Sequence, residues 1–285
     1  LTFLDQEQDA THIGITVTTS QVSAVHKIIK CIAAINSQVK IILGGAHITA
    51  AFASLRTYEK GQGNDLGKKE VERLSKIADV LVAGDGEFAI EQALQTSSHF
   101  VDADDPDSPF FLSEMILDNL PFPARHLIDL ESYHYSIEGH KSGSLIGQLG
   151  CPYACNFCSG RLSPSFRRIR TRSAQQVVAE MQHLYEVYHY TGFMMSDDEL
   201  NIPTNFNELM REIIALQGRL GVEFRLRGFI KANLFTEEQA RLMYAAGFRN
   251  LLTGFESGSE RILRNIEKKS TKAQNTRCME IAHRC

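Results

Sequence analysis

The chain has 285 residues, 43% of them hydrophobic, and a chain of this length typically folds as two domains. Its 30 Lys and Arg residues against 34 Asp and Glu residues give a formal net charge of −4, so it carries no overall basic field that would attract a nucleic acid. Unbroken apolar runs reach only five residues, at 31–35 and 242–246, whereas a membrane-spanning helix needs about 18. We therefore expect no nucleic-acid partner and no membrane partner.

The start of the chain carries no targeting signal. Residues 1–10, LTFLDQEQDA, begin with Leu1 rather than Met and lack the basic and apolar regions of a signal peptide. We expect a fragment or a processed start, and a cytoplasmic location.

The six cysteines are too few for a disulfide scaffold in a chain of this length, and they are unevenly placed. They are Cys31, Cys151, Cys155, Cys158, Cys278 and Cys285. In a reducing compartment the three clustered thiols stay available as metal ligands. We expect chemistry near residue 155, and only packing or solvent exposure for Cys278 and Cys285.

The first hundred residues alternate strand-like and helix-like segments, as βαβ units do. The predicted strands cover residues 12–18, 39–43 and 78–83, and the predicted helices cover 22–35, 49–58, 68–77 and 87–95. Three strands are fewer than the usual five or so of a doubly wound domain. The pattern predicts a Rossmann-like domain over residues 1–97 with a truncated front.

Residues 98–143 are rich in Asp, Pro and Ser, and we interpret them as an interdomain linker. Strand and helix alternation then resumes in residues 144–285. The predicted strands are 144–149, 193–196, 222–226 and 250–253, and the predicted helices are 173–188, 206–216 and 236–246. Because a (β/α)8 barrel uses about 31 residues per unit, this length predicts the first four βα units of a partial barrel. The fold class is therefore α/β.

The clustered cysteines lie in Cys151-Pro-Tyr-Ala-Cys155-Asn-Phe-Cys158, directly after a predicted strand. Barrel and doubly wound folds place their active sites at this carboxyl end of the strands. Three thiolates on one short loop can hold three corners of a 4Fe-4S cluster and leave the fourth iron open. The alternatives are a zinc site completed by His140 or His183, a redox disulfide, or thiols packed as small hydrophobes. The single C-x-x-C pair favours the cluster over zinc.

With this loop the sequence resembles the radical S-adenosylmethionine (SAM) superfamily, whose signature is C-x-x-x-C-x-x-C with an aromatic residue before the last cysteine, here Phe157. The resemblance continues, in the family's order, through RTRSAQQVVAEM, SDDELNI and the stretch from KANLFTEEQARLMYAAGF to ILRNIEKKST. It implies that Cys151, Cys155 and Cys158 ligate a 4Fe-4S cluster whose open iron chelates SAM. An electron from the cluster then splits SAM to a 5′-deoxyadenosyl radical. It also implies an electron donor such as flavodoxin or ferredoxin, and we assign no catalytic residue beyond the cluster ligands.

The resemblance implies further cofactor-binding residues. Asp197 and Asp198 follow the second strand of the predicted barrel, where the family contacts the SAM ammonium; the alternative is a helix N-cap. The segment Gly254-Phe255-Glu256-Ser257-Gly258 is similar to the family's G-[IV]-E-S-G, so Glu256 and Ser257 are expected to line the SAM site. The alternative there is a glycine turn with a capping serine.

Arg225, Arg227 and Lys231 surround the third strand of the predicted barrel, and we expect Arg227 to contact the cofactor. The family commonly has R-A-D where this chain has Lys231-Ala232-Asn233. Lysine cannot form the bidentate fork of arginine, so the carboxylate contact of that motif is altered here. For Arg225 a solvated strand edge is an equal alternative.

The front segment resembles the cobalamin-binding domain that precedes the barrel in one radical SAM class. The similar stretches are ITVTTS, VKIILGGAHIT, ADVLVAGDGEFAIEQAL and NLPFPARHLIDL. Gly44 and Gly45 let the backbone approach a ligand closely, which suits the nucleotide tail of cobalamin; the alternative is an ordinary βα turn. The D-x-H-x-x-G motif that often supplies a histidine to the cobalt is absent, because Asp9 and His12 have the wrong spacing.

These observations predict a radical SAM enzyme that uses a 4Fe-4S cluster, SAM and cobalamin for methyl transfer to an unactivated centre of a small-molecule or peptide substrate. One alternative is a radical SAM oxidoreductase or cyclase that does not use cobalamin. Another is a non-catalytic iron-sulfur or zinc module in which the three cysteines are structural ligands.

Overall fold

The computed structural model describes residues 10–202 and 204–285, which form two compact units. The first unit comprises residues up to 112 together with 158–167, and the second comprises 113–157 together with 168–285. The expectations for residues 1–9, including Asp9, lie outside the described residues. Among the described residues, no helix is both long and apolar enough to cross a membrane.

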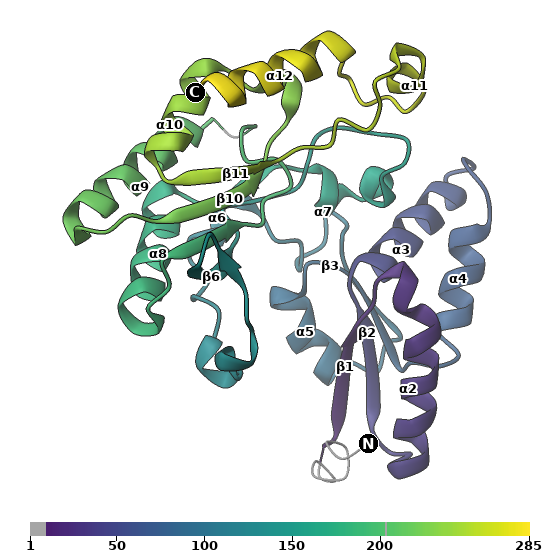
Figure 1. Cartoon of the computed structure of the whole chain (residues 1–285). Helices are drawn as coiled ribbons and strands as arrows, with labels where there is room; N and C mark the ends of the chain where they lie inside the picture. The colour runs from purple at the N-terminus through teal and green to yellow at the C-terminus, as the bar shows by residue number, and fades with distance from the viewer. Residues whose placement is uncertain (1–9, 203) are drawn as a thin grey trace. The chain divides into compact units, whose positions relative to one another are not determined.

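The first unit contains a four-stranded parallel sheet in the order β1-β2-β3-β4 (Figure 1). Its strands are β1 (His12–Thr16), β2 (Lys40–Gly44), β3 (Val80–Gly84) and β4 (Phe100–Ala103). Its helices are η1 (Thr19–Gln21), α2 (Val22–Ile35), α3 (Ala46–Glu59), α4 (Leu66–Leu74), α5 (Gly86–Gln95), η4 (Ser159–Leu162) and α7 (Pro164–Arg167).

Alternation along the strands builds two apolar layers. Ile41, Leu43 and Leu81 face the cluster that includes the buried sides of α2, α3 and α4. Ile42 and Val82 face the opposite cluster, which is covered by α5. Figure 1 shows α2 and α5 on opposite sides of this sheet. A parallel sheet buried on both faces is the Rossmann-like arrangement, as expected from the sequence.

The strand count of the first unit differs from the expectation of three. β4 lies at the start of the segment interpreted as a linker, and it pairs with β3 from Leu81↔Phe100 to Gly84↔Ala103. Its four residues, FVDA, run directly into DDPDSP, so neither alternation nor length marked it as a strand. Pairing with a buried neighbour, rather than its own pattern, makes this segment a strand.

The second unit contains a curved sheet in the order β11-β10-β9-β6-β5, in which only β5 runs antiparallel to its neighbour. Its strands are β5 (Ser136–Ile137), β6 (His140–Leu145), β9 (Gly192–Met195), β10 (Arg225–Phe229) and β11 (Phe248–Leu252), with the small pair β7 (Gln148–Leu149) and β8 (Arg170–Thr171) beside it. Its helices are α6 (Glu114–Leu117), η2 (Arg125–Leu127), η3 (Leu130–Ser132), α8 (Ala174–Tyr188), α9 (Phe206–Leu220), η5 (Ala232–Leu234), α10 (Glu237–Ala245), α11 (Glu260–Asn265) and α12 (Lys272–Arg284).

Each parallel strand of the second unit is followed by a helix, so four βα units run in chain order from β6 to α12. Figure 1 shows α8, α9 and α10 along one face of the curved sheet. Their buried residues, including Met181, Met210 and Met243, share one core with the inward side chains of the strands. The predicted α/β fold class, a Rossmann-like domain followed by a partial barrel, is confirmed.

The third strand of this series begins three residues later than predicted. Helix α9 ends at Leu220, and its C-cap Gly221 is left-handed. The Gln217 side chain then accepts a hydrogen bond from Phe224 N at 2.7 Å. Residues 222–224 are therefore a turn rather than the start of a strand. The first strand begins earlier than predicted, at His140, because its sequence HKSGSL alternates too weakly to be recognised.

A buried carboxylate holds part of the predicted linker against the second unit. Glu180 on α8 is only 2% exposed, and it forms ion pairs with Arg125 of η2 at 2.8 Å and with Arg172 at 2.7 Å. Arg125 also donates to the carbonyl of Ser144 at 3.0 Å, and Arg172 donates to that of Ile146 at 2.9 Å. One glutamate thus fixes the two arginines that bracket the end of β6.

We predict that Glu180→Ala lowers the free energy of unfolding by about 3–5 kcal/mol, because it leaves two largely buried guanidinium groups without their counter-ion. Urea unfolding followed by circular dichroism measures the change. Glu186→Ala is the matched control: Glu186 is exposed on the same helix, and its loss should cost no more than about 0.5 kcal/mol. Equal losses in the two variants would contradict this assignment.

Candidate functional site

The cysteine loop begins just beyond β7 and belongs to the second unit as far as Phe157, whereas Cys158 is the first residue of the stretch that belongs to the first unit. Gly150 precedes it with a φ of 83°, and a Cβ there would overlap the carbonyl of Arg168, so only glycine fits. Along the loop, Cys151 is partly buried, Cys155 is buried and Cys158 is exposed. All three are free thiols. Burial raises the pKa of the Cys151 thiol, and the nearby Glu199 and Asp198 carboxylates add to the rise.

The donor set of this loop fits an iron-sulfur cluster better than zinc. Within the described residues, no group of three His, Cys, Asp or Glu side chains is gathered for a metal ion. His140 lies at the opposite end of β6, about 16–17 Å back along the strand, and contacts Thr191 Oγ1 at 3.0 Å. His183 packs between the rings of Phe122 and Tyr188. Neither histidine is placed to complete a zinc site, whereas three thiols are the ligands that a cluster with one open iron requires.

The cysteine loop is attached to the segment that follows α11. Asn156 donates its backbone N–H to the carbonyl of Ile266 and its side-chain amide to the carbonyl of Asn265, both at 2.9 Å. The Lys268 ammonium lies 5.8 Å from the ring centre of Phe157, the aromatic residue of the motif. Phe157 therefore contributes to the packing of the loop through a cation–π contact.

Lys231 is a buried cation beside the same loop. Its side chain donates to the carbonyl of Lys268 at 3.1 Å, and its ammonium lies 4.1 Å from the ring centre of Tyr153. The Asn201 amide fixes its backbone, accepting from Lys231 N at 2.7 Å and donating to Lys231 O at 3.2 Å. Burial lowers the pKa of Lys231, and the neighbouring Lys268 charge lowers it further, while the Glu199 carboxylate opposes this.

A narrow polar cavity lies at the carboxyl ends of β10 and β11, and in this structure it is too tight to admit a water molecule. Its charged lining residues are Glu199, Lys231 and Lys268. Asn233 Oδ1 and Ser270 Oγ, which also belong to lining residues, are buried and have no hydrogen-bond partner within the part of the chain that the structure describes. Buried polar atoms without partners are unusual in a folded protein, so these two atoms have unused hydrogen-bonding capacity.

Asp197 and Asp198 have different environments. Asp197 is 1% exposed, and its Oδ1 accepts from Gly147 N at 2.6 Å and from Gln148 N, while its Oδ2 has no partner among the described residues. Burial raises the pKa of Asp197 to about 7, although these two hydrogen bonds oppose the rise. Asp198 is more exposed, and desolvation raises its pKa against the lowering effects of the Gly150 backbone and Arg170. Asp197 thus holds the turn after β6, and Asp198 is the more accessible carboxylate.

The Glu256–Ser257 segment follows β11. Glu256 has a left-handed φ of 58° and pairs with Lys268 at 3.0 Å, while Ser257 Oγ accepts from Ser259 N at 3.1 Å. Ser257 therefore makes the contact of a capping serine in a turn, which is the alternative to a cofactor-binding role. The expectation that these two residues contact a cofactor stays a prediction.

The two arginines of the third barrel strand have separate positions. Arg225, at the start of β10, pairs with Glu138 at 3.3 Å and with Glu223 at 3.2 Å, which is the strand-edge alternative. Arg227 lies further along the strand, and its buried Nε has no partner within residues 10–202 and 204–285. Only Arg227 retains free capacity toward a ligand.

Sequence reasoning missed Glu199, Lys268 and Ser270 as members of this site. All three lie inside stretches that resemble the family, but no spacing rule distinguishes Lys268 from the exposed Lys269 beside it.

Cys278 is packed in the core of the second unit, where burial raises its pKa to about 11, in keeping with a packing role.

In the first unit, Gly44 and Gly45 join β2 to α3. Gly45 has a φ of 97°, and a Cβ there would collide with Thr16 and Val17, so the close approach at this residue is made by the chain itself. A Cβ on Gly44 would make only ordinary contacts, the nearest with Val82 at 3.7 Å. Gly44 is therefore the position of the pair where a side chain would restrict a ligand without straining the fold.

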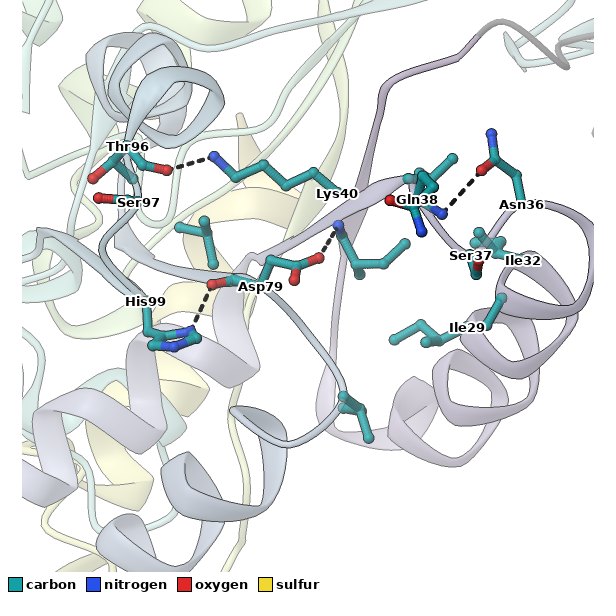
Figure 2. Close-up of a pocket in the computed structure, with 15 residues that line it drawn as sticks. Ile29, Ile32, Asn36, Ser37, Gln38, Lys40, Asp79, Thr96, Ser97 and His99 are labelled. Atoms are coloured by element: carbon teal, nitrogen blue, oxygen red, sulfur yellow. Dashed lines mark hydrogen bonds between the residues drawn. The ribbon is translucent and has the colours of Figure 1, made fainter.

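A cleft of about 530 Å³ lies at the opposite edge of the same sheet, by the amino ends of β2 and β3 (Figure 2). Lys40 reaches the carbonyls of Ala93, Leu94 and Thr96 at 2.6–3.1 Å and so caps the carboxyl end of α5. Asp79 accepts from Ile41 N at 2.7 Å, and His99 contacts the Asp79 carbonyl at 2.9 Å. Since these polar groups already serve the fold, the cleft offers no chemistry despite its size.

The comparisons with known proteins agree with this geometry. The sequence profile of the Radical SAM superfamily matches residues 145–285. These residues belong to the radical SAM superfamily, whose members bind a 4Fe-4S cluster and SAM, and the predicted membership is confirmed.

Three known proteins are similar to this chain over 98% or more of its length. An uncharacterised methyltransferase of Pyrococcus horikoshii is 26% identical over 99% of this chain and 60% of its own length. The radical SAM methyltransferase TsrM of Kitasatospora setae, solved with tryptophan and a SAM analogue, has a TM-score of 0.71 at 19% identity and covers 99% of this chain and 57% of TsrM. The cobalamin-dependent radical SAM enzyme OxsB, solved with aqua-cobalamin and SAM, has a TM-score of 0.70 at 16% identity and covers 98% of this chain and 40% of OxsB. The chain thus spans about 60% or less of these relatives, and its fold is similar to those of TsrM and OxsB.

We predict that Asp197→Asn makes the stability of the iron-free chain less sensitive to pH. Because the folded-state pKa of Asp197 is raised to about 7, the unfolded chain loses this proton near pH 4 and the folded chain only near pH 7. Between these values wild-type stability falls by up to about 1.4 kcal/mol per pH unit from this group. The asparagine variant lacks this loss and keeps an oxygen for the two backbone donors.

The measurement is the difference in unfolding free energy between variant and wild type at pH 5 and at pH 8. The difference should shift in favour of Asp197→Asn at pH 8, whereas the exposed Asp107→Asn should show no such shift. A difference that does not change with pH would show that Asp197 titrates normally.

Proposed function

We propose that this chain is the core of a cobalamin-dependent radical SAM methyltransferase, with Cys151, Cys155 and Cys158 as the ligands of a 4Fe-4S cluster. The observation that carries the proposal is the position of the three-thiol loop at the carboxyl end of a barrel strand, attached to the segment after α11 and next to a polar cavity with unpartnered atoms. When bound, the cluster supplies the electron that cleaves SAM reductively.

The residues around the cavity suit the zwitterionic methionine part of SAM. The buried Lys231 and Lys268 offer positive charge to a carboxylate, and Glu199 offers negative charge to an ammonium group. Asn233 Oδ1 and Ser270 Oγ offer hydrogen bonds that nothing among the described residues uses. Asp198, Arg227, Glu256 and Ser257 are the remaining candidates for contacts to SAM.

The barrel residues also order the loop. Asp197 fixes the turn after β6, and Tyr153 and Phe157 cover the two lysines with their rings.

The first unit supports the cobalamin part of the proposal. Its parallel sheet presents Gly44 at the carboxyl end of β2, the edge at which doubly wound folds bind ligands. TsrM has also been solved with cobalamin and a 4Fe-4S cluster bound, and both TsrM and OxsB share the fold of nearly the whole chain. Bound cobalamin supplies a metal centre that can carry a methyl group. We further propose a cytoplasmic enzyme that receives electrons from a flavodoxin or ferredoxin and methylates a small molecule or peptide.

We predict that anaerobic reconstitution with iron and sulfide gives a reducible cluster whose electron paramagnetic resonance spectrum changes when SAM is added. Cys151→Ala should abolish both the cluster signal and SAM cleavage, because two thiolates of the loop do not hold the cluster. The matched control is Cys31→Ala, which removes an exposed thiol on α2 and should behave as wild type. Bound zinc, or a cluster that does not respond to SAM, would contradict the radical SAM assignment.

We predict that the chain binds hydroxocobalamin and that Gly44→Ala weakens this binding at least about tenfold. The added methyl group meets only ordinary contacts within the protein, so it should obstruct the ligand and leave the fold intact. Absorbance titration measures the affinity, and the melting temperature checks the fold. Gly86→Ala, where a Cβ meets open space, is the control. Failure of the wild-type chain to bind a corrinoid would remove cobalamin from the proposal but not the radical SAM chemistry.

A further inference from the structure

The segment that directly follows the third cysteine is held by one buried carboxylate. Asp104, immediately after β4, is 0% exposed. Its Oδ1 accepts from Ser165 N at 2.9 Å, from Ser165 Oγ at 2.5 Å and from Ser163 Oγ. Both serines are also fully buried. The chain from Cys158 to Ser165 is therefore fixed at its far end by three hydrogen bonds to a single oxygen.

The charge of Asp104 is balanced inside the same unit. Arg56 on α3 donates to Asp104 Oδ2 and, with its other terminal nitrogen, to Asp102 Oδ2. Asp102 in turn accepts from the backbone of Asp104 at 2.9 Å and of Asp105 at 3.2 Å. Asp102 thus pairs with the same arginine as Asp104 but accepts from the backbone of its own segment.

The segment between Cys158 and Ser163 has little freedom of its own. Cys158 is the N-cap of η4, whose turn is closed by Arg161 N to Cys158 O at 3.3 Å and Ser163 N to Gly160 O at 3.0 Å. Gly160 is buried against Phe166, and a Cβ at Gly160 would collide with that ring. These contacts connect the third cysteine to Asp104 through one short, closed turn.

Burying a carboxylate is unfavourable unless it is paired and hydrogen-bonded, so an ordinary surface loop does not need such an anchor. The anchored segment follows the most exposed of the three thiols, and a cluster must bring all three together. Ordering a loop before ligation removes entropy that metal binding would otherwise have to overcome. We propose that Asp104, charge-balanced by Arg56, is a positioning residue that orders the segment after Cys158 for ligation of the cluster.

This inference rests on the proposed function, because it assumes that Cys158 is a cluster ligand. The test compares three variants with the wild-type chain: Asp104→Asn, the double variant Ser163→Ala with Ser165→Ala, and the control Asp102→Asn. The double variant removes the side-chain bonds of the segment and leaves the Asp104–Arg56 pair in place. It therefore remains informative if Asp104→Asn does not fold.

The first readout is hydrogen exchange of residues 158–167 in the iron-free chain. The second is the rate at which an iron chelator removes iron from the reconstituted chain, recorded with the SAM-dependent change of the paramagnetic spectrum. We expect Asp104→Asn and the double serine variant to increase exchange in this segment and to lose iron at least about fivefold faster. Asp102→Asn should match the wild type in both measurements.

Unchanged iron loss in the double serine variant, with faster exchange in its segment, would overturn the positioning role. Faster iron loss in Asp102→Asn to the same degree would also overturn it, since the effect would then reflect general loosening around Arg56. Failure of the wild-type chain to hold any cluster is a separate outcome, because it contradicts the proposed function itself.

Discussion

The carboxylate of Asp197 joins the ends of two neighbouring parallel strands, and the candidate site depends on that link. Strands β6 and β9 pair from Ser142↔Gly192 to Leu145↔Met195, and the backbone N–H of Ser196 continues the ladder to the carbonyl of Leu145 at 2.8 Å. Beyond the last bond of this ladder, the Asp197 side chain replaces the backbone of β9 as acceptor and binds the backbone N–H groups of Gly147 and Gln148. The turn that leads into the cysteine loop therefore has its N–H groups satisfied without water. The position at which the cysteine loop begins is therefore fixed, although the loop itself pairs with no strand.

Past this turn, the site is built from charges on segments that are distant in sequence. Lys231 comes from the end of β10 and Lys268 from the segment after α11, yet Lys231 donates to the Lys268 carbonyl, and each lysine lies over an aromatic ring of the cysteine loop. Glu199 and Glu256 supply the opposite charge. Two cations beside a loop of thiols favour the bound, negatively charged state of such a loop. The same cations are available to an anionic group of a ligand.

The sequence was sufficient for the features that depend on neighbours along the chain. Helix α2 was predicted with the bounds it has, because Val22, Val25, Ile29 and Ile32 recur at helical spacing, and the cysteine spacing led to the family. The features that were missed depend on distant partners. β4 is a strand because β3 lies beside it, Lys231 meets Lys268 across 37 residues, and Asp104 meets Ser165 across 61. Periodicity carries no information about such contacts, so only the fold reveals them.

Three buried acids share one structural task. Glu180 fixes arginines on either side of the end of β6, Asp197 fixes the turn after β6, and Asp104 fixes the segment after Cys158. Each thus holds irregular chain against a regular element. Irregular segments lack a ladder for their polar groups, and an ionised carboxylate can accept about four hydrogen bonds at once, more than any neutral side chain. A single acidic side chain can therefore replace several backbone hydrogen bonds. Burying its carboxylate costs solvation free energy, and the hydrogen bonds and ion pairs from its donors offset that cost. A fold that places a long irregular loop at its chemical centre is for this reason expected to concentrate buried acids around that loop.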